Sequence, residues 1–185
     1  MKIIKLQNEK LLIKKAIQNN REAQQQLFAK HSPKMLGVCR QYVKDLHHAE
    51  DLLLVGFFKV FTNLAKFKHE GSFEGWIRRI MVNTCISYLR KKNFITVSDE
   101  DFVFNNAATE SLENTSVKDI QKLIDALPEG YKMVFNLYAI EGFKHSEIAS
   151  KLGISSSTSK TQLFRARNLL QENYIKMNKK IHEKR

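Results

Sequence analysis

Hydrogen-bond donors without any acidic neighbour are concentrated between Ser155 and Gln171. Their lysine, arginine, threonine and glutamine side chains can donate to phosphate oxygens and to the edges of DNA bases. A face that only meets solvent normally mixes its charges, so the lack of Asp and Glu favours a polyanionic partner. The donors are Thr158, Lys160, Thr161, Gln162, Arg165 and Arg167.

These donors lie on the second helix of a predicted helix-turn-helix over residues 141–171. Apolar residues share one face of a short first helix, and Gly153 accepts the positive φ of a sharp turn without steric cost. The hydroxyls of residues 155–158 can cap a second helix that suits the major groove. An ordinary helical hairpin with a solvated basic face is the alternative. The apolar stripes of the two helices are Ile148, Ala149 and Leu152, then Leu163, Ala166 and Leu170.

A second cluster mixes aromatic and basic residues between Phe67 and Lys92. A loop over residues 67–73 leads into a predicted helix over residues 74–92, on which Trp76 is accompanied by several arginines. Single-stranded nucleic acid suits such a mixture, because bases stack on aromatic rings and phosphates need cations. The alternative places Trp76 in the core and leaves the arginines in solvent.

The predicted helix Glu50–Leu64 has apolar residues on two faces. One face spans roughly 100° of arc and has the periodicity of a core-facing stripe. The second face combines apolar residues with Asp51. Either neighbouring helices bury this second face, or it is a docking surface for another protein with Asp51 as its charged contact. The first face holds Leu53, Phe57, Val60, Phe61 and Leu64, and the second holds Leu54, Val55 and Phe58.

The charges divide the chain into three parts. Its 185 residues carry a formal net charge of +12, which implies a polyanionic partner. Residues 1–93 and 117–185 are basic, whereas residues 94–116 hold five acids, no lysine or arginine and no helical periodicity. We therefore expect an all-α fold of two small helical domains, 8–93 and 117–176, joined by a flexible acidic linker, 94–116.

Spacing and composition argue against several other classes of protein. No glycine-rich phosphate loop, nucleophile elbow or H-E-x-x-H motif occurs, so we expect neither an enzyme nor a cofactor. Cys39 and Cys85 lie in apolar helical patterns, which predicts buried reduced thiols and a cytoplasmic protein. No apolar run is long enough to insert into a membrane. The group His47, His48, Glu50 and Asp51 matches no metal-ligand spacing, and we expect no metal there.

The remaining helices follow from apolar spacing and turn residues. Asn19-Asn20 predicts a turn, and Ser32-Pro33 predicts the start of another helix, because proline at the first helical position gives up no needed donor. Two further helices are predicted over residues 117–127 and 131–140, with a turn at residues 128–130 between them.

Three segments in order resemble the extracytoplasmic-function sigma factors of the sigma-70 family, the small kind with regions 2 and 4 only. Regions 2.1–2.2 are similar to AEDLLLVGFFKVFTNLAKF at 49–67, and regions 2.3–2.4 to SFEGWIRRIMVNTCISYLRKK at 72–92. Region 4 is similar to ALPEGYKMVFNLYAIEGFKHSEIASKLGISSSTSKTQLFRARNLL at 126–170. Three such segments around an acidic linker make the resemblance specific.

The resemblance implies a protein that is not a catalyst but gives RNA polymerase promoter recognition and strand opening. A coiled coil of the largest polymerase subunit would contact Asp51, Leu54, Val55 and Phe58. The implied contacts to the −10 element are Gly71, Ser72, Phe73, Trp76, Arg78, Arg79, Asn83 and Arg90, with Asn83 as a candidate base contact. The implied contacts to the −35 element are Ser156, Ser157, Thr158, Lys160, Thr161, Gln162, Arg165 and Arg167.

Promoter DNA and core RNA polymerase are therefore the expected partners, and the family also implies an anti-sigma factor, for which the apolar second face is a candidate site. The alternative is a helix-turn-helix regulator that does not form holoenzyme. Such a regulator explains the C-terminal basic part of the chain. It explains neither the helix Glu50–Leu64 nor the segment around Trp76.

Two positions depart from the family pattern. The family usually has glutamine followed by an acid where this chain has Leu54 and Val55, so we expect weaker binding to polymerase or a different partner for this face. Lys144 stands where serine or threonine commonly caps the first helix of the helix-turn-helix. Lysine cannot accept backbone N–H bonds, so we expect this helix start to be weaker by about 1 kcal/mol.

Overall fold

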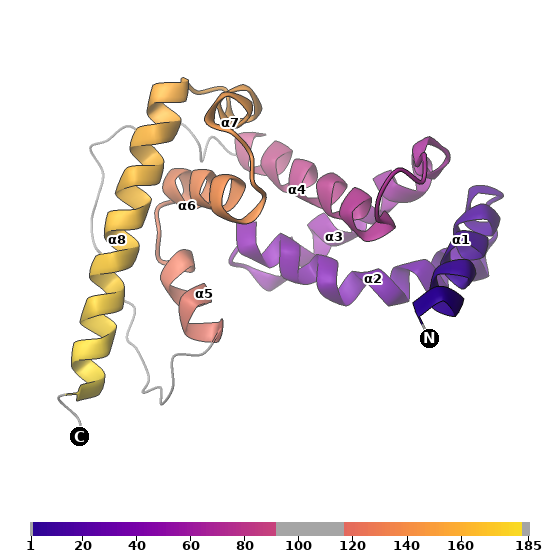
Figure 1. The fold of residues 1–185 in the computed structure, drawn as a ribbon, viewed down its shortest axis with the longest axis horizontal. Coiled ribbons are helices and arrows are strands. Elements are labelled where there is room, and N and C mark those ends of the chain that lie inside the picture. Colours follow the sequence, from indigo (N-terminus) through magenta and orange to yellow (C-terminus); the bar gives the residue numbers. More distant parts are fainter. Residues whose placement is uncertain (1, 92–116, 183–185) are drawn as a thin grey trace. The chain divides into compact units, whose positions relative to one another are not determined.

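The computed structural model describes residues 2–91 and 117–182, and every regular element in these two ranges is a helix (Figure 1). The expected all-α fold is therefore confirmed. The chain divides into two compact units, Met1–Ser87 and Tyr88–Arg185. The predicted linker, 94–116, lies outside the described residues. None of the described helices is long and apolar enough to cross a membrane.

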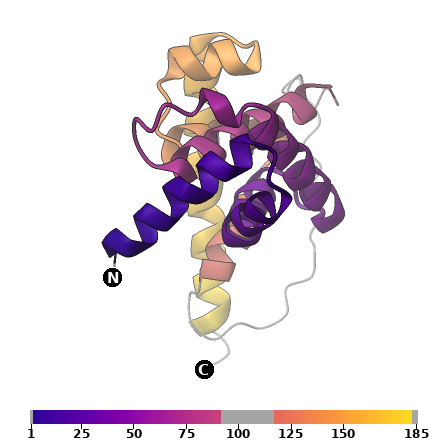
Figure 2. The ribbon, with the colours of Figure 1, turned by 90° about the vertical axis from the view of Figure 1, so that its right-hand side faces the viewer.

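The helices that begin in the first unit are α1 (Lys2–Ile17), α2 (Arg21–Tyr42), α3 (Leu46–Thr62), the short 3-10 helix η1 (Leu64–Lys66) and α4 (Phe73–Lys91). Both α1 and α3 pack against α2 (Figures 1 and 2). The turn between α1 and α2 forms as predicted. Asn19 takes a positive φ of 59°, and Asn20 Oδ1 accepts a hydrogen bond from Ala23 N at 2.9 Å. Asparagine tolerates both roles better than most residues.

The predicted helix start at Ser32-Pro33 is wrong, because α2 continues through Pro33. Proline has no N–H to donate and normally kinks or ends a helix. Here His31 and Met35 are buried on either side of it. Tertiary packing of both halves outweighs the missing hydrogen bond, so one long helix results.

The core of the first unit includes a close approach of α3 to α4. Gly56 has no side chain, and a Cβ atom there would collide with the sulfur of the fully buried Met81. Lys59 Nζ also donates to Thr84 Oγ1 at 3.1 Å across these two helices. The predicted core-facing stripe is confirmed for Leu53, Phe57, Val60 and Leu64, whereas Phe61 is only partly buried.

Cys39 of α2 and Cys85 of α4 meet in this core as buried, free thiols, as predicted. The hydrogen bond between them raises the pKa of Cys85 far above its ordinary value, and burial acts in the same direction. The uncharged thiol is therefore the form of Cys85 that the core holds at neutral pH.

The helices of the second unit are α5 (Val117–Asp125), α6 (Glu129–Phe135), the π-helical turn η2 (Asn136–Ile140), α7 (His145–Leu152) and α8 (Ser156–His182). Figure 1 shows α5, α6 and α7 beside the long helix α8, against which all three pack. Ile148 and Leu152 of α7 and Leu163 and Ala166 of α8 are buried. The apolar stripes predicted for the helix-turn-helix are confirmed at these four positions, whereas Ala149 and Leu170 are only partly buried.

Candidate nucleic-acid interface

The helix-turn-helix forms at the predicted residues. Gly153 takes the left-handed conformation with φ 71° and ψ 31° and ends α7. Ser155 Oγ accepts a hydrogen bond from Thr158 N at 2.9 Å, so Ser155 caps α8. At the start of α7, Lys144 makes no side-chain cap, as predicted, although Glu147 Oε2 accepts a hydrogen bond from Lys144 N at 2.7 Å. The predicted loss of stability at this helix start stays a prediction.

The first turns of α8 expose most of the predicted donors but not all of them. Gln162 and Arg165 are half-buried: Gln162 lies against Gly130, and Arg165 donates to the hydroxyl of Tyr131 at 3.1 Å. These two side chains therefore take part in the packing of α8 on α6. The exposed donors are Ser156, Ser157, Thr158, Lys160, Thr161 and Arg167.

Phe164 is an exposed aromatic residue on α8 that the sequence analysis missed. Its side chain is 65% exposed, one turn beyond Lys160 and Thr161 and therefore on their face. A phenyl ring in the major groove can contact the methyl group of thymine. The sequence feature that could have indicated Phe164 is its place outside the buried stripe of its helix, which is unusual for a large apolar residue.

His145 lies at the start of α7 beside the cations of α8. Its Nδ1 atom is 2.9 Å from Ser159 Oγ, and its ring stacks on Tyr138 with centroids 4.7 Å apart. Partial burial lowers the pKa of His145, and the charges of Lys160 and Arg167 lower it further. The imidazole is therefore neutral at neutral pH. An anion bound at these cations would raise this pKa, because it would offset their charge.

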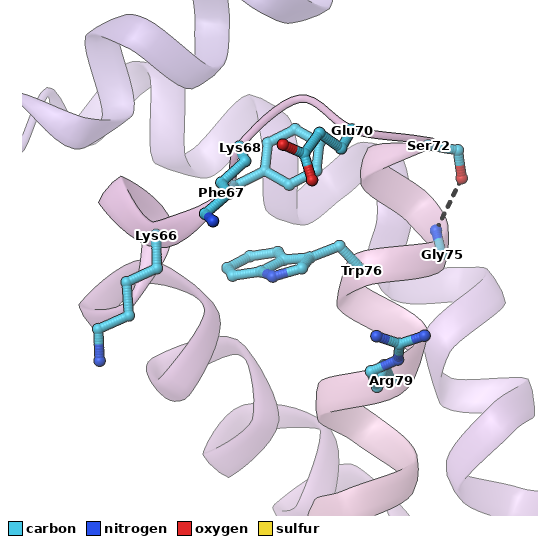
Figure 3. A pocket seen from close by; sticks show the side chains of 8 residues that line it. All are labelled: Lys66, Phe67, Lys68, Glu70, Ser72, Gly75, Trp76 and Arg79. Atoms are coloured by element: carbon cyan, nitrogen blue, oxygen red, sulfur yellow. Dashed lines mark hydrogen bonds between the residues drawn. The ribbon is translucent and has the colours of Figure 1, made fainter.

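A pocket of about 380 Å³ opens beside the loop that precedes α4 (Figure 3). The indole of Trp76 lies on one side of it, and the loop residues Lys68 and Glu70 lie on the other. Ser72 Oγ accepts a hydrogen bond from Gly75 N at 2.9 Å, which caps α4 and fixes the end of the loop. The lining residues are Lys66, Phe67, Lys68, Glu70, Ser72, Gly75, Trp76 and Arg79.

Two positive φ angles shape the loop above this pocket. Gly71 has φ 105°, which only glycine takes without steric cost, and His69 has φ 58°. The ring of His69 contacts the ring of Phe67, with centroids 4.8 Å apart. Gly71 is exposed but is not among the lining residues, and its contact with the −10 element stays a prediction.

Three of the residues implied for the −10 element, Ser72, Trp76 and Arg79, meet at this pocket. Two alternatives were predicted for Trp76, a surface on which bases stack and a place in the core. Trp76 is half-buried, so its position lies between them. Its ring packs on Phe67 and Phe73 at centroid distances of 5.5 and 5.9 Å. One part of the indole is thus anchored in the core while the rest faces the pocket.

Phe73 is buried, with only 4% of its side chain exposed, and its contact with DNA stays a prediction. Its ring contacts those of His31, Phe67 and Trp76. Phe73 occupies the first position of α4, where the chain turns inward from the loop. In this structure it supports the indole of Trp76.

The other residues implied for the −10 element are not gathered at the pocket. Arg78 is turned toward α2, where its guanidinium lies 3.5 Å from Gln41 Oε1. Asn83 and Arg90 are exposed farther along α4. The lining residues that the sequence analysis did not assign are Lys66, Phe67, Lys68, Glu70 and Gly75. The sequence feature that could have indicated these residues is the basic and aromatic character of the loop.

The second face of α3 is exposed in the described part of the chain. Leu54, Val55 and Phe58 are 58%, 47% and 73% exposed, and Asp51 is exposed beside them. Burial by the neighbouring described helices is therefore excluded as the explanation of these apolar residues. Three large apolar side chains around one acid form a surface of the kind that binds another protein.

The sequence matches two family models, Sigma-70 region 2 over residues 27–95 and Sigma-70 region 4 over residues 118–170. It is 31% identical over 131 residues to RNA polymerase sigma factor SigZ of Bacillus subtilis, covering 70% of this chain and 74% of the relative. It is 30% identical over 135 residues to ECF RNA polymerase sigma factor SigM of the same organism, covering 71% and 82%. This chain is an extracytoplasmic-function sigma factor of the sigma-70 family.

As a sigma factor, the protein directs core RNA polymerase to promoters and takes part in transcription initiation. The alternative of a regulator that does not form holoenzyme is set aside, because both family regions are present in one chain. ECF sigma factor SigW of Bacillus subtilis extends the likeness over almost the whole chain: 28% identity over 182 residues, covering 88% of this sigma factor and 96% of SigW.

Proposed function

We propose that this sigma factor divides its work among three surfaces. The second face of α3 binds polymerase through Asp51, Leu54, Val55 and Phe58. The pocket beside α4 holds an unpaired base of the −10 element, and the exposed face of α8 contacts the −35 element. The domains responsible are 8–93 and 117–176, joined by residues 94–116, and the protein works beside polymerase in the cytoplasm.

The pocket beside α4 is the observation that carries this proposal. It joins an aromatic platform, Trp76, to cations at Lys66, Lys68 and Arg79. A base can enter only after it leaves the duplex, since its ring must stack on the indole. Binding energy gained by the stacked base therefore favours the melted promoter over the closed one.

The proposal is tested with holoenzyme made from the full-length sigma factor and core polymerase. We expect transcription from a set of templates that share one −10 and one −35 sequence, selected from a library randomised upstream of the start site. Core polymerase alone is the control and should show no such selection. Selection of a −35 sequence without any −10 sequence would contradict the role given to the pocket.

Replacing Lys160 by alanine is expected to weaken binding of duplex −35 DNA almost equally for all sequences. An exposed lysine that contacts phosphate releases about one counterion, so the slope of log K against log salt should fall by about one. Titrations at several salt concentrations measure this slope. Lys122→Ala is the matched control, because Lys122 is also exposed but lies on α5. Equal slopes for Lys160→Ala and the unchanged protein would contradict the assignment.

The double change Leu54→Gln and Val55→Glu is expected to tighten binding to core polymerase. Both side chains are exposed, so the change should not disturb the core. Each polar contact regained contributes about 0.5–1.5 kcal/mol, which together gives roughly a tenfold gain in affinity. Leu46→Gln is the control, since Leu46 is 50% exposed on the same helix but outside this face. No gain would refute the account that Leu54 and Val55 weaken binding to polymerase.

A further inference from the structure

An imidazole and a buried hydroxyl meet where α7 packs on α8. Nδ1 of His145 lies 2.9 Å from Oγ of Ser159, whose side chain is fully buried, whereas His145 is half-buried. A hydroxyl can donate a hydrogen bond to a neutral imidazole and accept one from a protonated imidazole. His145 therefore keeps this partner whether or not its ring is charged.

The other ring nitrogen of His145, Nε2, forms no hydrogen bond with the described residues of the chain. A protonated imidazole donates through both of its nitrogens. With Nδ1 held by Ser159, Nε2 can donate to a ligand at the surface.

Two cations of α8 and the phenol of Tyr138 in η2 face His145. Lys160 follows Ser159 directly, and Arg167 lies two turns further along the same face of α8. The guanidinium of Arg167 lies over the ring of Tyr138, 5.6 Å from its centroid, and this ring stacks on His145. Partial burial lowers the pKa of His145, and Lys160 and Arg167 lower it further. An anion bound to these cations would remove their share of this effect.

The charged groups of α7 and of the turn before it are directed elsewhere. Glu147 accepts a hydrogen bond from Lys144 N, and Nζ of Lys151 lies over the ring of Phe143, 4.8 Å from its centroid. Neither Glu147 nor Lys151 contributes to the lowered pKa of His145. The charge that a ligand meets beside His145 is thus positive, which suits a phosphate.

We propose that His145 is a phosphate contact of the −35 site and takes up one proton from solvent when duplex DNA binds. This inference rests on the proposed function, in which the exposed face of α8 contacts the −35 element. A phosphate bound beside Lys160 and Arg167 offsets their charge, and Nε2–H of the imidazolium donates to a phosphate oxygen. The added proton forms one N–H bond on the ring, and Ser159 Oγ then accepts from Nδ1–H.

Proton uptake makes the affinity for duplex −35 DNA depend on pH, because DNA raises the pKa of His145 above its value in the free protein. Tight binding is fully present below the pKa of the free protein, which is lower than the ordinary histidine value. It is lost as the pH rises through the pKa of the bound state. We expect an overall loss of roughly tenfold between about pH 5 and about pH 8.

The test measures the affinity of the full-length chain, at constant salt, for duplex DNA with the −35 sequence that holoenzyme selects. His145→Gln is the variant, because glutamine can still bond to Ser159 but does not titrate. It should match the unchanged protein near about pH 8, where both side chains are neutral, and bind roughly tenfold more weakly near about pH 5. A purely structural role would weaken binding equally at every pH, and that result would overturn the inference.

The unchanged protein also allows a direct measurement of the proton. Calorimetry of DNA binding in buffers of different ionisation enthalpy, at about pH 6.5, should show more proton uptake than His145→Gln, by up to about one proton per complex. Equal uptake by the two proteins would contradict the proposal.

His47→Gln is the matched control, since His47 lies on α3 in the other unit and its side chain is 90% exposed. This variant should keep the pH dependence of the unchanged protein. Affinity that does not change with pH, while the −35 sequence is still preferred, would overturn the role of His145 alone. Loss of the pH dependence in both variants would reveal a general charge effect and would also overturn it. No preference for the −35 sequence at any pH would instead refute the proposed function.

Discussion

Trp76→Ala is expected to reduce promoter opening by roughly 10- to 100-fold, because stacking of one base on an aromatic ring contributes about 1–3 kcal/mol. The indole is the aromatic platform of the pocket and is already held by Phe67 and Phe73. The unpaired base therefore gains the stacking energy without ordering the ring first. Binding of polymerase through α3 and of duplex −35 DNA through α8 should change little.

The fluorescence of Trp76 can be used to follow base stacking, since it is the one tryptophan of the chain. Quenching of its fluorescence by a single-stranded −10 oligonucleotide in the holoenzyme, corrected for core polymerase alone, should report the stacked base directly. Permanganate reactivity of unpaired thymines measures opening for Trp76→Ala. Trp76→Phe is the control, because a smaller ring still stacks and should retain most of the opening. Normal opening by a Trp76→Ala protein that keeps its helix content would refute the role of the indole.

Asp51→Lys is expected to weaken binding to core polymerase by roughly 100-fold, since losing one partner of a desolvated charge pair costs about 2–5 kcal/mol. Asp51 is exposed on the face that also presents Leu54, Val55 and Phe58. Those apolar neighbours would exclude water from the contact once polymerase is bound. A lysine at this position would face the cation of polymerase that pairs with Asp51. Both positive charges would then be without a partner and would repel each other.

The affinity of labelled sigma factor for core polymerase measures this effect. Glu22→Lys is the matched control, because it reverses the charge of another exposed acid, in the first turn of α2. A comparable loss for both variants would indicate a general effect of net charge. Retained binding by Asp51→Lys would mean that polymerase uses a different surface of this sigma factor.

Local chemistry explains which features followed from the sequence alone. Gly153 and Ser155 fix the corner of the helix-turn-helix, because a left-handed residue and a hydroxyl cap act within a few residues of the chain. The apolar period of α3 likewise separated its buried face from the face of Leu54, Val55 and Phe58. Neither feature depends on which distant segment packs nearby, so spacing predicted both.

The pocket and the orientation of α8 were decided by tertiary structure. Lys66 and Arg79 meet only because the loop between them closes back onto α4, and spacing does not determine that path. The burial of Phe73 and the half-burial of Gln162 have one cause, because a helix face is buried or exposed according to the element that packs on it. Helical periodicity fixes which residues share a face, but only the packed fold decides what covers it.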